Sequence, residues 1–332
     1  ANTGVLTFSS APDYEAAADS DTNNTYIVEV TATDGTNTDV QTITVTVDNL
    51  NDNTPDITSD GGAATANLNV NENQTAVTTV VATDADGTSP TFSITGGVDS
   101  ALFNIDSNTG VLTFDSAPDY EAAADSDANN TYIVEVTATD GTNTDIQTIT
   151  VNVNNLNDNT PDITSDGGGV TAGINIDENE TAVTTVAATD ADGTSPTFNI
   201  TGGVDSALFD IEANTGVLTF SSAPDYEAAA DSDTNNTYIV EVTATDGTNT
   251  DVQTITVTVN TLNDSAPVIT SGSGLTAFVN AAENQTTATT VTASDADGTN
   301  PVFSITGGAD SALFNIDANT GVLTFDSAPD YE

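Results

Sequence analysis

Apolar and polar residues alternate with a period of two along short stretches of the chain, a pattern that predicts β-strands. From Tyr132 to Ala138, every second residue is apolar, so one face of this segment is expected to be buried. The segment 147–153 repeats the pattern. The inward positions predicted in this way are Tyr132, Val134, Val136, Ala138, Ile149, Val151 and Val153, with the pairs Phe92 and Ile94, and Leu112 and Phe114.

Turn residues separate these segments, for example at Asp140-Gly141, Gly96-Gly97 and 108–110. Threonine is abundant, and its β-branched side chain favours strands over helices. About seven such strands, with no convincing helical period, fall within each stretch of about a hundred residues. The pattern therefore predicts an all-β chain of antiparallel β-sandwiches.

The segment Pro-Asp-Tyr-Glu recurs through the chain, which indicates tandem repeats. Its copies begin at Pro12, Pro118, Pro224 and Pro329, spaced 106, 106 and 105 residues apart. The repeat boundaries predicted from this spacing are 1–53 (the C-terminal part of a repeat), 54–159 and 160–265 (complete repeats) and 266–332 (the N-terminal part of a repeat). A repeat of this size is large enough to be a domain with its own core.

Residues 318–332 repeat residues 1–15 with one substitution, so the chain begins and ends inside a sandwich. We expect the chain to be an internal piece of a longer repetitive polypeptide. The alternative is that the N-terminal half-domain of one chain completes the C-terminal half-domain of another, which would cover exposed strand edges.

The charge of the chain indicates that it needs a cation from outside. It contains 51 Asp and Glu residues but no Lys, Arg or His, which gives a formal net charge of −51. Two carboxylates ~5 Å apart repel by roughly 3 kcal/mol at an effective dielectric constant of about 20. The same charge disfavours nucleic acid and anionic membrane surfaces as partners, because no side chain can neutralise a phosphate.

The absence of several residue types bears on catalysis and location. Without His, Lys, Arg or Cys, no usual base, nucleophile or oxyanion-binding side chain exists. A carboxylate pair can hydrolyse a glycoside, but such pairs recur here in every repeat, as structural ligands do. The chain also lacks Met and Trp. Without Cys it has no disulfides, and without Cys and Met it resists oxidation, which suits an extracellular protein. The sequence contains no signal peptide, lipidation motif or transmembrane segment.

Acidic motifs follow one another in the same order in both complete repeats. In the first they are Asn71-Glu72-Asn73, Asp84-Ala85-Asp86, Asp119-Tyr120-Glu121, Thr139-Asp140-Gly141 and Asn155-Leu156-Asn157-Asp158-Asn159. This succession resembles the cadherin repeat, in its bacterial cadherin-like form, over essentially the whole chain. The resemblance implies Greek-key sandwiches of seven strands in an elongated array, with calcium held between successive domains.

Carried over from the resemblance, calcium ligands are expected at three repeat junctions. The first would use Asp13, Glu15, Asn51, Asp52, Asn53, Asp84, Asp86 and Asp140. The second would use Glu72, Asp119, Glu121, Asn157, Asp158, Asn159, Asp190, Asp192 and Asp246. The third would use Glu178, Asp225, Glu227, Asn263, Asp264, Asp295 and Asp297. The seven carboxylates of the second junction nearly balance three divalent ions, so up to about three Ca²⁺ are expected per junction, and oxygen ligands without His or Cys suit calcium.

The linkers depart from the family pattern in ways that affect these sites. Their first position, usually acidic in cadherins, is Asn49, Asn155 and Thr261 in turn. The third linker also ends on Ser265 in place of Asn, so we expect its calcium to be fewer or looser. The absence of Trp gives no support to adhesion by exchange of a Trp-bearing strand.

Other acidic residues are expected to be solvated turn residues, namely Asp19, Asp21, Asp39 and Asp99. Asp125 and Asp127 lie in an insert where either solvation or an extra ion is compatible with the sequence. No EF-hand loop with Gly at its sixth position and a closing Glu is present.

The function expected from these features is mechanical. Calcium at each linker would stiffen a row of sandwiches into an extracellular stalk or fibre for attachment, spacing or matrix formation, with neighbouring repeats and identical chains as partners. The alternative is adhesive recognition of a glycan or a partner-cell protein through loops. Aromatic residues make up only 5% of the chain and fall mostly at inward positions, which favours the stalk.

Overall fold

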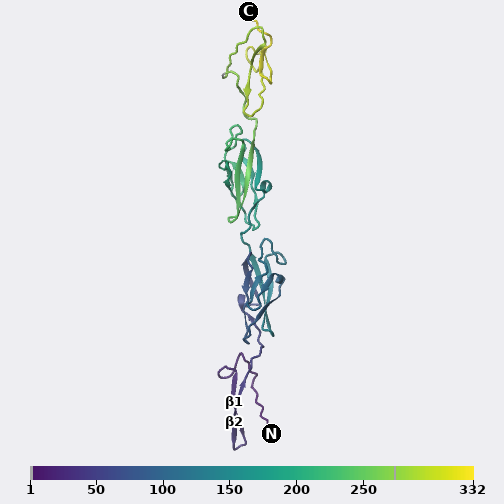
Figure 1. The fold of residues 1–332 in the computed structure, drawn as a ribbon, viewed down its shortest axis with the longest axis vertical. Helices are drawn as coiled ribbons and strands as arrows, with labels where there is room; N and C mark the ends of the chain where they lie inside the picture. The colour runs from purple at the N-terminus through teal and green to yellow at the C-terminus, as the bar shows by residue number, and fades with distance from the viewer. Residues whose placement is uncertain (1–2, 273) are drawn as a thin grey trace. The chain divides into compact units, whose positions relative to one another are not determined.

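The computed structural model describes residues 3–272 and 274–332. The chain divides into two compact units, residues 1–156 and 157–332, called unit 1 and unit 2 below. Each unit contains one complete two-sheet sandwich and part of another (Figure 1). Among the described residues, helical structure is confined to short 3₁₀ turns, and none of it is long and apolar enough to cross a membrane.

The strands of unit 1 are β1 (Thr25–Thr33), β2 (Thr38–Thr46), β3 (Asp56–Ile57), β4 (Thr65–Asn71), β5 (Ala76–Thr79), β6 (Ala82–Thr83), β7 (Thr91–Gly96), β8 (Phe103–Ile105), β9 (Val111–Phe114), β10 (Thr131–Thr139) and β11 (Thr144–Asn154). Its 3₁₀ turns are η1 (Ser59–Gly61) and η2 (Ser100–Leu102).

The strands of unit 2 are β12 (Asp162–Ile163), β13 (Thr171–Asp177), β14 (Ala182–Thr185), β15 (Ala188–Thr189), β16 (Thr197–Gly202), β17 (Phe209–Ile211), β18 (Val217–Phe220), β19 (Thr237–Thr245), β20 (Thr250–Asn260), β21 (Val268–Ile269), β22 (Thr287–Thr290), β23 (Ala293–Ser294), β24 (Phe314–Ile316) and β25 (Val322–Phe325). Its 3₁₀ turns are η3 (Ser165–Gly167), η4 (Ser206–Leu208) and η5 (Ser311–Leu313).

The complete sandwich of unit 1 packs a four-stranded sheet, in the order β4-β11-β10-β7, against a three-stranded sheet, β5-β9-β8. Unit 2 repeats this arrangement with β13-β20-β19-β16 and β14-β18-β17. These two sheets hold the seven predicted strands, and a pair of two-residue strands, β3-β6 or β12-β15, is added to each sandwich. The expectation of antiparallel pairing is wrong for one pair of strands. Strands β4 and β11, which lie near the start and the end of the repeat, pair in parallel.

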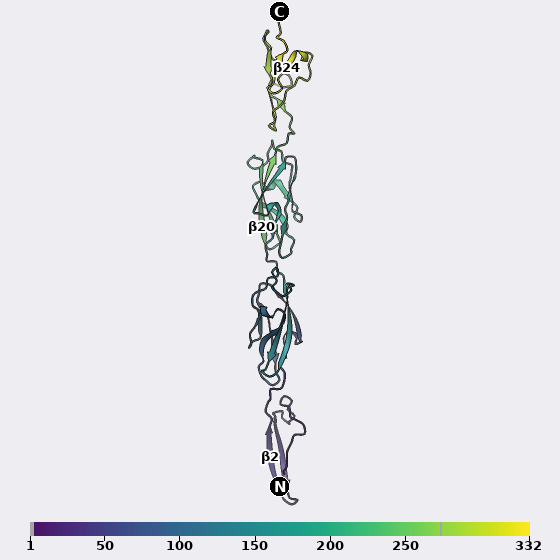
Figure 2. The same ribbon diagram turned by 90° about the vertical axis from the view of Figure 1, so that its right-hand side faces the viewer.

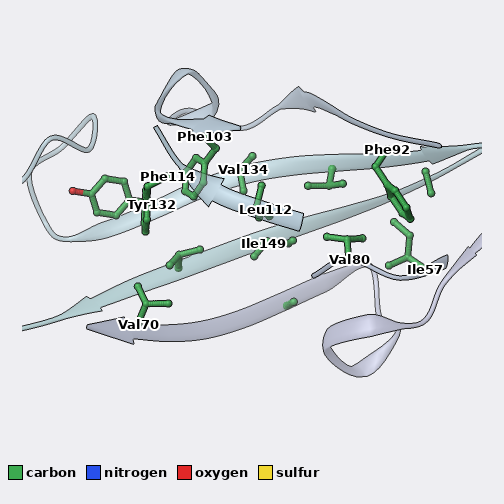
Figure 3. Packing of buried hydrophobic residues seen from close by; sticks show 14 of the residues in the cluster. Ile57, Val70, Val80, Phe92, Phe103, Leu112, Phe114, Tyr132, Val134 and Ile149 are labelled. Carbon is green, nitrogen blue, oxygen red and sulfur yellow. The ribbon is translucent and has the colours of Figure 1, made fainter. Parts of the chain in front are cut away.

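The core of each complete sandwich lies between its two sheets, where alternate residues of the strands meet. Val134 and Val136 of β10 and Ile149 of β11 are fully buried, as the alternation predicts. Phe103 and Phe114 stack at 4.7 Å between ring centroids, and Tyr132 meets Phe114 edge-on (Figure 3). Equivalent residues form a second core in unit 2. Burial of these apolar faces is the main force that stabilises each sandwich.

The partial sandwiches contain different sets of strands. In unit 1, β1 and β2 form a two-stranded antiparallel hairpin, and no other described residue adds a strand to it (Figure 1). In unit 2, β24 and its neighbours β25 and β22 form a three-stranded sheet, and β21 pairs with β23 (Figure 2). Several residues that are buried in the complete sandwiches are therefore exposed in the partial ones.

Candidate metal centres

Glu72, directly after β4, is the buried centre of one acidic group. Only 3% of its surface is exposed. Its Oε2 accepts a hydrogen bond from the backbone N–H of Tyr120 at 2.7 Å, and its Oε1 accepts one from Leu156 at 2.7 Å. Oxygens of Glu72, Asp119 and Glu121 all lie within 4.8 Å of one another. Two backbone amides therefore hold Glu72 in place at the end of the sandwich.

Unit 2 builds the same group around Glu178, which is 1% exposed. Its carboxylate accepts hydrogen bonds from the backbone N–H groups of Tyr226 at 2.8 Å and Leu262 at 2.6 Å. Oxygens of Glu178, Asp225 and Glu227 lie within 4.8 Å of one another. Desolvation raises the pKa of the Glu227 carboxyl, and the charge of Glu178 raises it further, as expected where carboxylates crowd together without a cation.

The Asp-Tyr-Glu segments form tight turns that bring an aspartate and a glutamate to the same side. Asp119 Oδ1 accepts hydrogen bonds from the backbone N–H groups of Glu121 at 3.0 Å and Ala122 at 3.1 Å. Asp13 makes the equivalent bonds to Glu15 and Ala16. Aspartate commonly caps its own turn in this way.

At the first linker, residues from distant parts of unit 1 converge. Oxygens of Glu15, Asp52 and Asp86 lie within 4.8 Å of one another. Desolvation raises the pKa of the exposed Glu15 carboxyl, and the charges of Asp86, Asp13 and Asp52 raise it further. The linker and the Asp84-Ala85-Asp86 segment are therefore positioned to bind one cation together.

Asp86 links this group to a second one, in which oxygens of Asp84, Asp86 and Asp140 lie within 4.8 Å of one another. Asn53 holds both oxygens of Asp86: its backbone N–H donates to Oδ2 and its Nδ2 to Oδ1, each at 2.8 Å. Hydrogen bonds from the backbone N–H groups of Asn143 and Thr142 lower the pKa of the Asp140 carboxyl, which keeps it ionised.

Unit 2 begins with the equivalent of this arrangement. Asn159 donates from its backbone N–H to Asp192 Oδ2 at 2.9 Å and from its Nδ2 to Oδ1 at 2.8 Å. The backbone N–H of Asp192 donates to Asp190 Oδ1 at 2.9 Å. Asp246 caps its own turn, and the amide of Asn157 reaches that turn through a 3.1 Å hydrogen bond to the Thr248 hydroxyl.

The last linker, residues 261–265, is bonded differently. The backbone N–H of Ser265 donates to Asp297 Oδ2 at 2.9 Å, but Ser265 has no amide with which to reach Oδ1. At the other end of the linker, the Thr261 hydroxyl donates to Glu227 Oε1 at 3.3 Å. Asp264 accepts a hydrogen bond from Asn179 Nδ2 at 2.7 Å, while Asn263 is exposed.

These groups fit a hard divalent cation on three counts. The ligand atoms available are carboxylate and amide oxygens, which calcium prefers. Asp84 Oδ2, Asp190 Oδ2 and Asp297 Oδ1 are buried oxygens with no hydrogen-bond partner. A buried carboxylate oxygen without a partner is costly, and a bound cation would remove that cost. The chain offers no Lys, Arg or His as a counter-charge.

The residues predicted from the sequence fall into three sets. Those with oxygens inside a common 4.8 Å group include Glu15, Asp52, Asp84, Asp86, Asp140, Glu72, Asp119, Glu121, Glu178, Asp225 and Glu227. Those joined to such residues, or to one another, by hydrogen bonds are Asp13, Asn51, Asn53, Asn159, Asp190, Asp192, Asp295 and Asp297. Those placed in linkers or turns nearby are Asn157, Asp158, Asp246, Asn263 and Asp264.

Sequence reasoning missed one residue of this kind, Glu283. Its Oε2 accepts the backbone N–H of Tyr331 at 3.0 Å, as Glu72 does with Tyr120. The signal was present in the sequence, because Glu283 precedes Asn284 just as Glu72 precedes Asn73. Glu283 is exposed, whereas its counterparts Glu72 and Glu178 are buried.

A second acidic cluster lies away from the linkers, and it corrects the expectation for Asp99. Asp99 is not solvated: it is 4% exposed, and its carboxylate accepts backbone N–H groups of Ser126 at 2.8 Å and Ile133 at 2.9 Å. Asp125 is similarly buried. Its side-chain hydrogen bond with Asp127 raises the pKa of the Asp127 carboxyl, and desolvation and the negative charge of Asp125 raise it further. Asp99 therefore connects the loop at Ser126 to strand β10 through these two hydrogen bonds. The extra ion at Asp125 and Asp127 stays a prediction.

Comparison with known proteins identifies the family. The family model described as the cadherin domain matches residues 66–154 and 173–262, one match in each complete sandwich. The chain belongs to the cadherin family. Cadherin domains bind calcium, and their homologues are extracellular adhesion proteins rather than enzymes, so the chain is not an enzyme. The expected cadherin-like tandem repeats are confirmed.

Curated cadherin relatives align with most of the chain. It is 29% identical over 308 residues to Protocadherin Fat 4 of Homo sapiens, covering 88% of the chain and 6% of that protein. It is 31% identical over 330 residues to Cadherin EGF LAG seven-pass G-type receptor 2 of Mus musculus, covering 92% of the chain and 10% of that protein. The chain therefore spans a small part of the length of these relatives.

Solved cadherin structures have the same fold. Repeats EC22-24 of mouse Cadherin-23 align with a TM-score of 0.64 at 21% identity, covering 85% of this chain and 91% of that one. The extracellular domain of Protocadherin GammaB4 aligns with a TM-score of 0.65 at 25% identity, covering 95% of this chain and 51% of that one. The predicted fold class, tandem cadherin-like sandwiches, is confirmed.

Proposed function

We propose that this chain is a segment of an extracellular stalk or fibre whose cadherin repeats are stiffened by calcium at the linkers. The repeats are taken as residues 54–159 and 160–265, flanked by the partial repeats 1–53 and 266–332. The carboxylates and Asn oxygens of the three junctions would hold up to about three Ca²⁺ each. Calcium supplies the positive charge that the chain lacks, and it would tie the linker to the ends of the adjoining sandwiches.

The observation that carries this proposal is the convergence of carboxylates with no protein cation to balance them. Glu15, Asp52 and Asp86 approach within 4.8 Å, although they come from a turn, a linker and the next sandwich. Ordering such a group without a cation costs free energy through mutual repulsion. A ligand that binds only the ordered state stabilises that state by a free energy that rises with the logarithm of the ligand concentration.

A stalk is favoured over adhesive recognition by the placement of the large side chains. Phe92, Phe103, Phe114 and Tyr132 are at most 8% exposed in the complete sandwich of unit 1. Recognition surfaces are usually rich in accessible aromatic residues and Arg. The near identity of the two complete repeats also suits a spacer, which needs length more than variety. Lateral association of identical chains into bundles belongs to the same proposal.

Small-angle scattering of the chain in calcium and in excess chelator tests the proposal. We expect a longer and narrower distribution of interatomic distances in calcium, because bound ions restrict the linkers. Magnesium at equal concentration serves as the control, since it binds poorly to flexible all-protein sites. Identical distributions in calcium and chelator would contradict a stiffening role.

A further inference from the structure

The four-stranded sheet of each complete sandwich has one face in the core and one on the surface. On β11, Ile149 and Val151 are fully buried, so Thr148, Thr150 and Asn152, which alternate with them, point outward. The same alternation applies to β10 and β4. The centre of this outward surface in unit 1, called the Thr/Asn face below, consists of Asn67, Asn69, Thr131, Ile133, Thr148 and Thr150.

Strand pairing sets these side chains next to one another across the sheet. Thr150 lies opposite Ile133 of β10 and beside Asn67 of β4. Asn152 Nδ2 donates to Asn69 Oδ1 at 3.4 Å. The face is therefore an ordered surface of hydroxyl, amide and methyl groups.

The Thr/Asn face carries little of the charge of the chain. Among the outward residues that the structure describes in β4, β11, β10 and β7, Glu135 is the one carboxylate. The outward surface of the smaller sheet β5-β9-β8 differs, because Asp115 accepts a hydrogen bond there from Asn104, which lies opposite Thr113. Two copies of a chain with a net charge of −51 therefore repel each other least where their Thr/Asn faces meet.

Unit 2 presents the same face with few changes. Thr256 of β20 lies opposite Ile239, as the equivalent pair does in unit 1. The carboxylates among the outward residues described in this sheet are Glu241 and Asp177, the latter at the end of β13. Hydroxyl and amide groups both donate and accept hydrogen bonds, so such a face can pair with an identical face, as a two-fold interface requires.

Aliphatic side chains on this surface are accessible to a partner. Ile146 is 49% exposed and lies opposite Thr137, and Val252 is 41% exposed and lies opposite Thr243. Sheets that pack face to face lie about 10 Å apart, with their side chains interdigitated. Contact of two such faces would bury the aliphatic groups and the threonine methyl groups together.

We propose that the Thr/Asn face binds the same face of a second copy of this chain. The inference names the surface for the lateral association included in the proposed function, and it rests on that proposal. A neutral, self-complementary face suits a second copy, whereas a basic partner would be attracted to the acidic groups at the linkers.

The size of the face predicts weak association through a single sandwich. Four strands spaced about 4.8 Å apart, with nine residues as in β10, cover roughly 600 Å². A stable interface of standard size buries about 800 Å² per partner. We therefore expect association that grows with protein concentration and with the number of complete sandwiches in the chain.

Salt distinguishes this contact from one in which calcium bridges carboxylates of two chains. The screening length falls from about 30 Å at 0.01 M salt to about 8 Å at 0.15 M, so repulsion between acidic chains weakens. At constant calcium, association through neutral faces should strengthen as KCl is raised over this range. Association that weakens with KCl would contradict the proposal.

Sedimentation velocity at 0.15 M KCl, over a range of concentrations, tests the contact surface. We expect species of twice 33.6 kDa that grow with concentration. The double variant Thr150→Asp, Thr256→Asp adds one charge to the face in each unit and should weaken association about tenfold or more. Thr113→Asp, Thr219→Asp is the matched control: it adds the same charges to half-buried threonines of the smaller sheets and should change association less than about threefold. A 33.6 kDa species at all concentrations, or equal effects of the two double variants, would overturn the proposal.

Cross-linking gives a second test that disturbs the sheet less, since cysteine is close to threonine in size and the chain has no cysteine of its own. A bifunctional maleimide that spans about 10 Å, the spacing of packed sheets, should link Thr150→Cys chains into covalent dimers. Thr113→Cys is the control and should give a several-fold lower yield. Equal yields from the two variants would overturn the assignment of the face.

Scattering at low concentration separates this inference from the stalk itself. In calcium, Thr150→Asp, Thr256→Asp should keep the longer distance distribution expected of the unmodified chain. Loss of that lengthening in both chains would overturn the stalk proposal, whereas lengthening together with equal association of the two double variants would overturn only the Thr/Asn face. A chain that stays single but sediments with cellulose, and loses this in Thr150→Asp, Thr256→Asp, would make a neutral glycan the occupant and overturn the second copy.

Discussion

The first linker, residues 49–53, and the last, residues 261–265, occupy equivalent places but hold the following aspartate differently. Asn53 bonds both oxygens of Asp86, with its backbone N–H and its side-chain amide. Ser265 bonds only Oδ2 of Asp297, and Asp297 Oδ1 is buried without a hydrogen-bond partner. The side-chain amide of Asn53, which Ser265 lacks, therefore makes the difference between an aspartate held at both oxygens and one held at a single oxygen.

The two linkers differ in how firmly the ligand side chain is held, although the charge of that side chain is the same. Both aspartates carry the same charge, but Asp86 is pre-positioned and Asp297 is held at one oxygen only. Ligands that are already in place lose less conformational entropy on binding. We therefore predict that the last junction binds calcium more loosely than the first, as its sequence suggests.

The largest effect is expected from removal of the buried glutamate of the last junction. Glu178→Ala leaves the backbone N–H groups of Tyr226 and Leu262 without their acceptor. Unsatisfied buried donors cost about 1 to 3 kcal/mol each, so we expect a loss of about 2 to 4 kcal/mol in the free energy of unfolding of that sandwich. Denaturant unfolding in calcium and in chelator measures it.

Glu180→Ala is the matched control, because Glu180 is exposed two residues further on. It should change the free energy of unfolding by less than about 0.5 kcal/mol. Equal losses in the two variants would mean that general charge, not the position of Glu178, governs stability.

Exchange of the linker residues tests the comparison directly. Asn53→Ser removes the donor to Asp86 Oδ1 and should lower stability by about 1 kcal/mol in chelator, with weaker calcium binding at the first junction. Ser265→Asn should do the opposite at the last junction. Calcium titration calorimetry of both variants measures the shifts. Shifts of the same sign would contradict the role assigned to the amide.

A smaller effect is expected at the first linker position. Thr261→Asn removes the hydroxyl that donates to Glu227 Oε1 and restores the residue found at 49 and 155. Because Glu227 is exposed, the change in calcium affinity should be slight and smaller than that of Ser265→Asn. If Thr261→Asn changed the calcium affinity more than Ser265→Asn, then residue 261, not residue 265, would be the cause of weaker calcium binding at the last junction.

Much of the fold followed from the sequence because its signals are local. Alternation identified Val134 and Val136 as buried, and the repeat spacing placed equivalent residues in unit 2. The parallel pairing of β4 with β11 did not follow, since alternation says nothing about strand direction.

The candidate sites depended on more than local pattern. Residues far apart in the chain, such as Glu15 and Asp86, were brought together only through the family resemblance. Asp99 was misjudged because a turn aspartate looks the same whether its carboxylate meets water or buried backbone amides. Glu283 was missed because it lies beyond the third linker, whereas ligands were expected at three linkers only.

Calorimetric unfolding of the chain at several calcium concentrations tests the central claim most directly. Calcium that binds the folded junctions at about one hundred times its dissociation constant stabilises the folded state by about 2.7 kcal/mol per site. The account predicts a melting temperature that rises with calcium and falls in excess chelator, with the transition of Glu178→Ala responding less. A melting temperature that is the same in calcium and in chelator would contradict it.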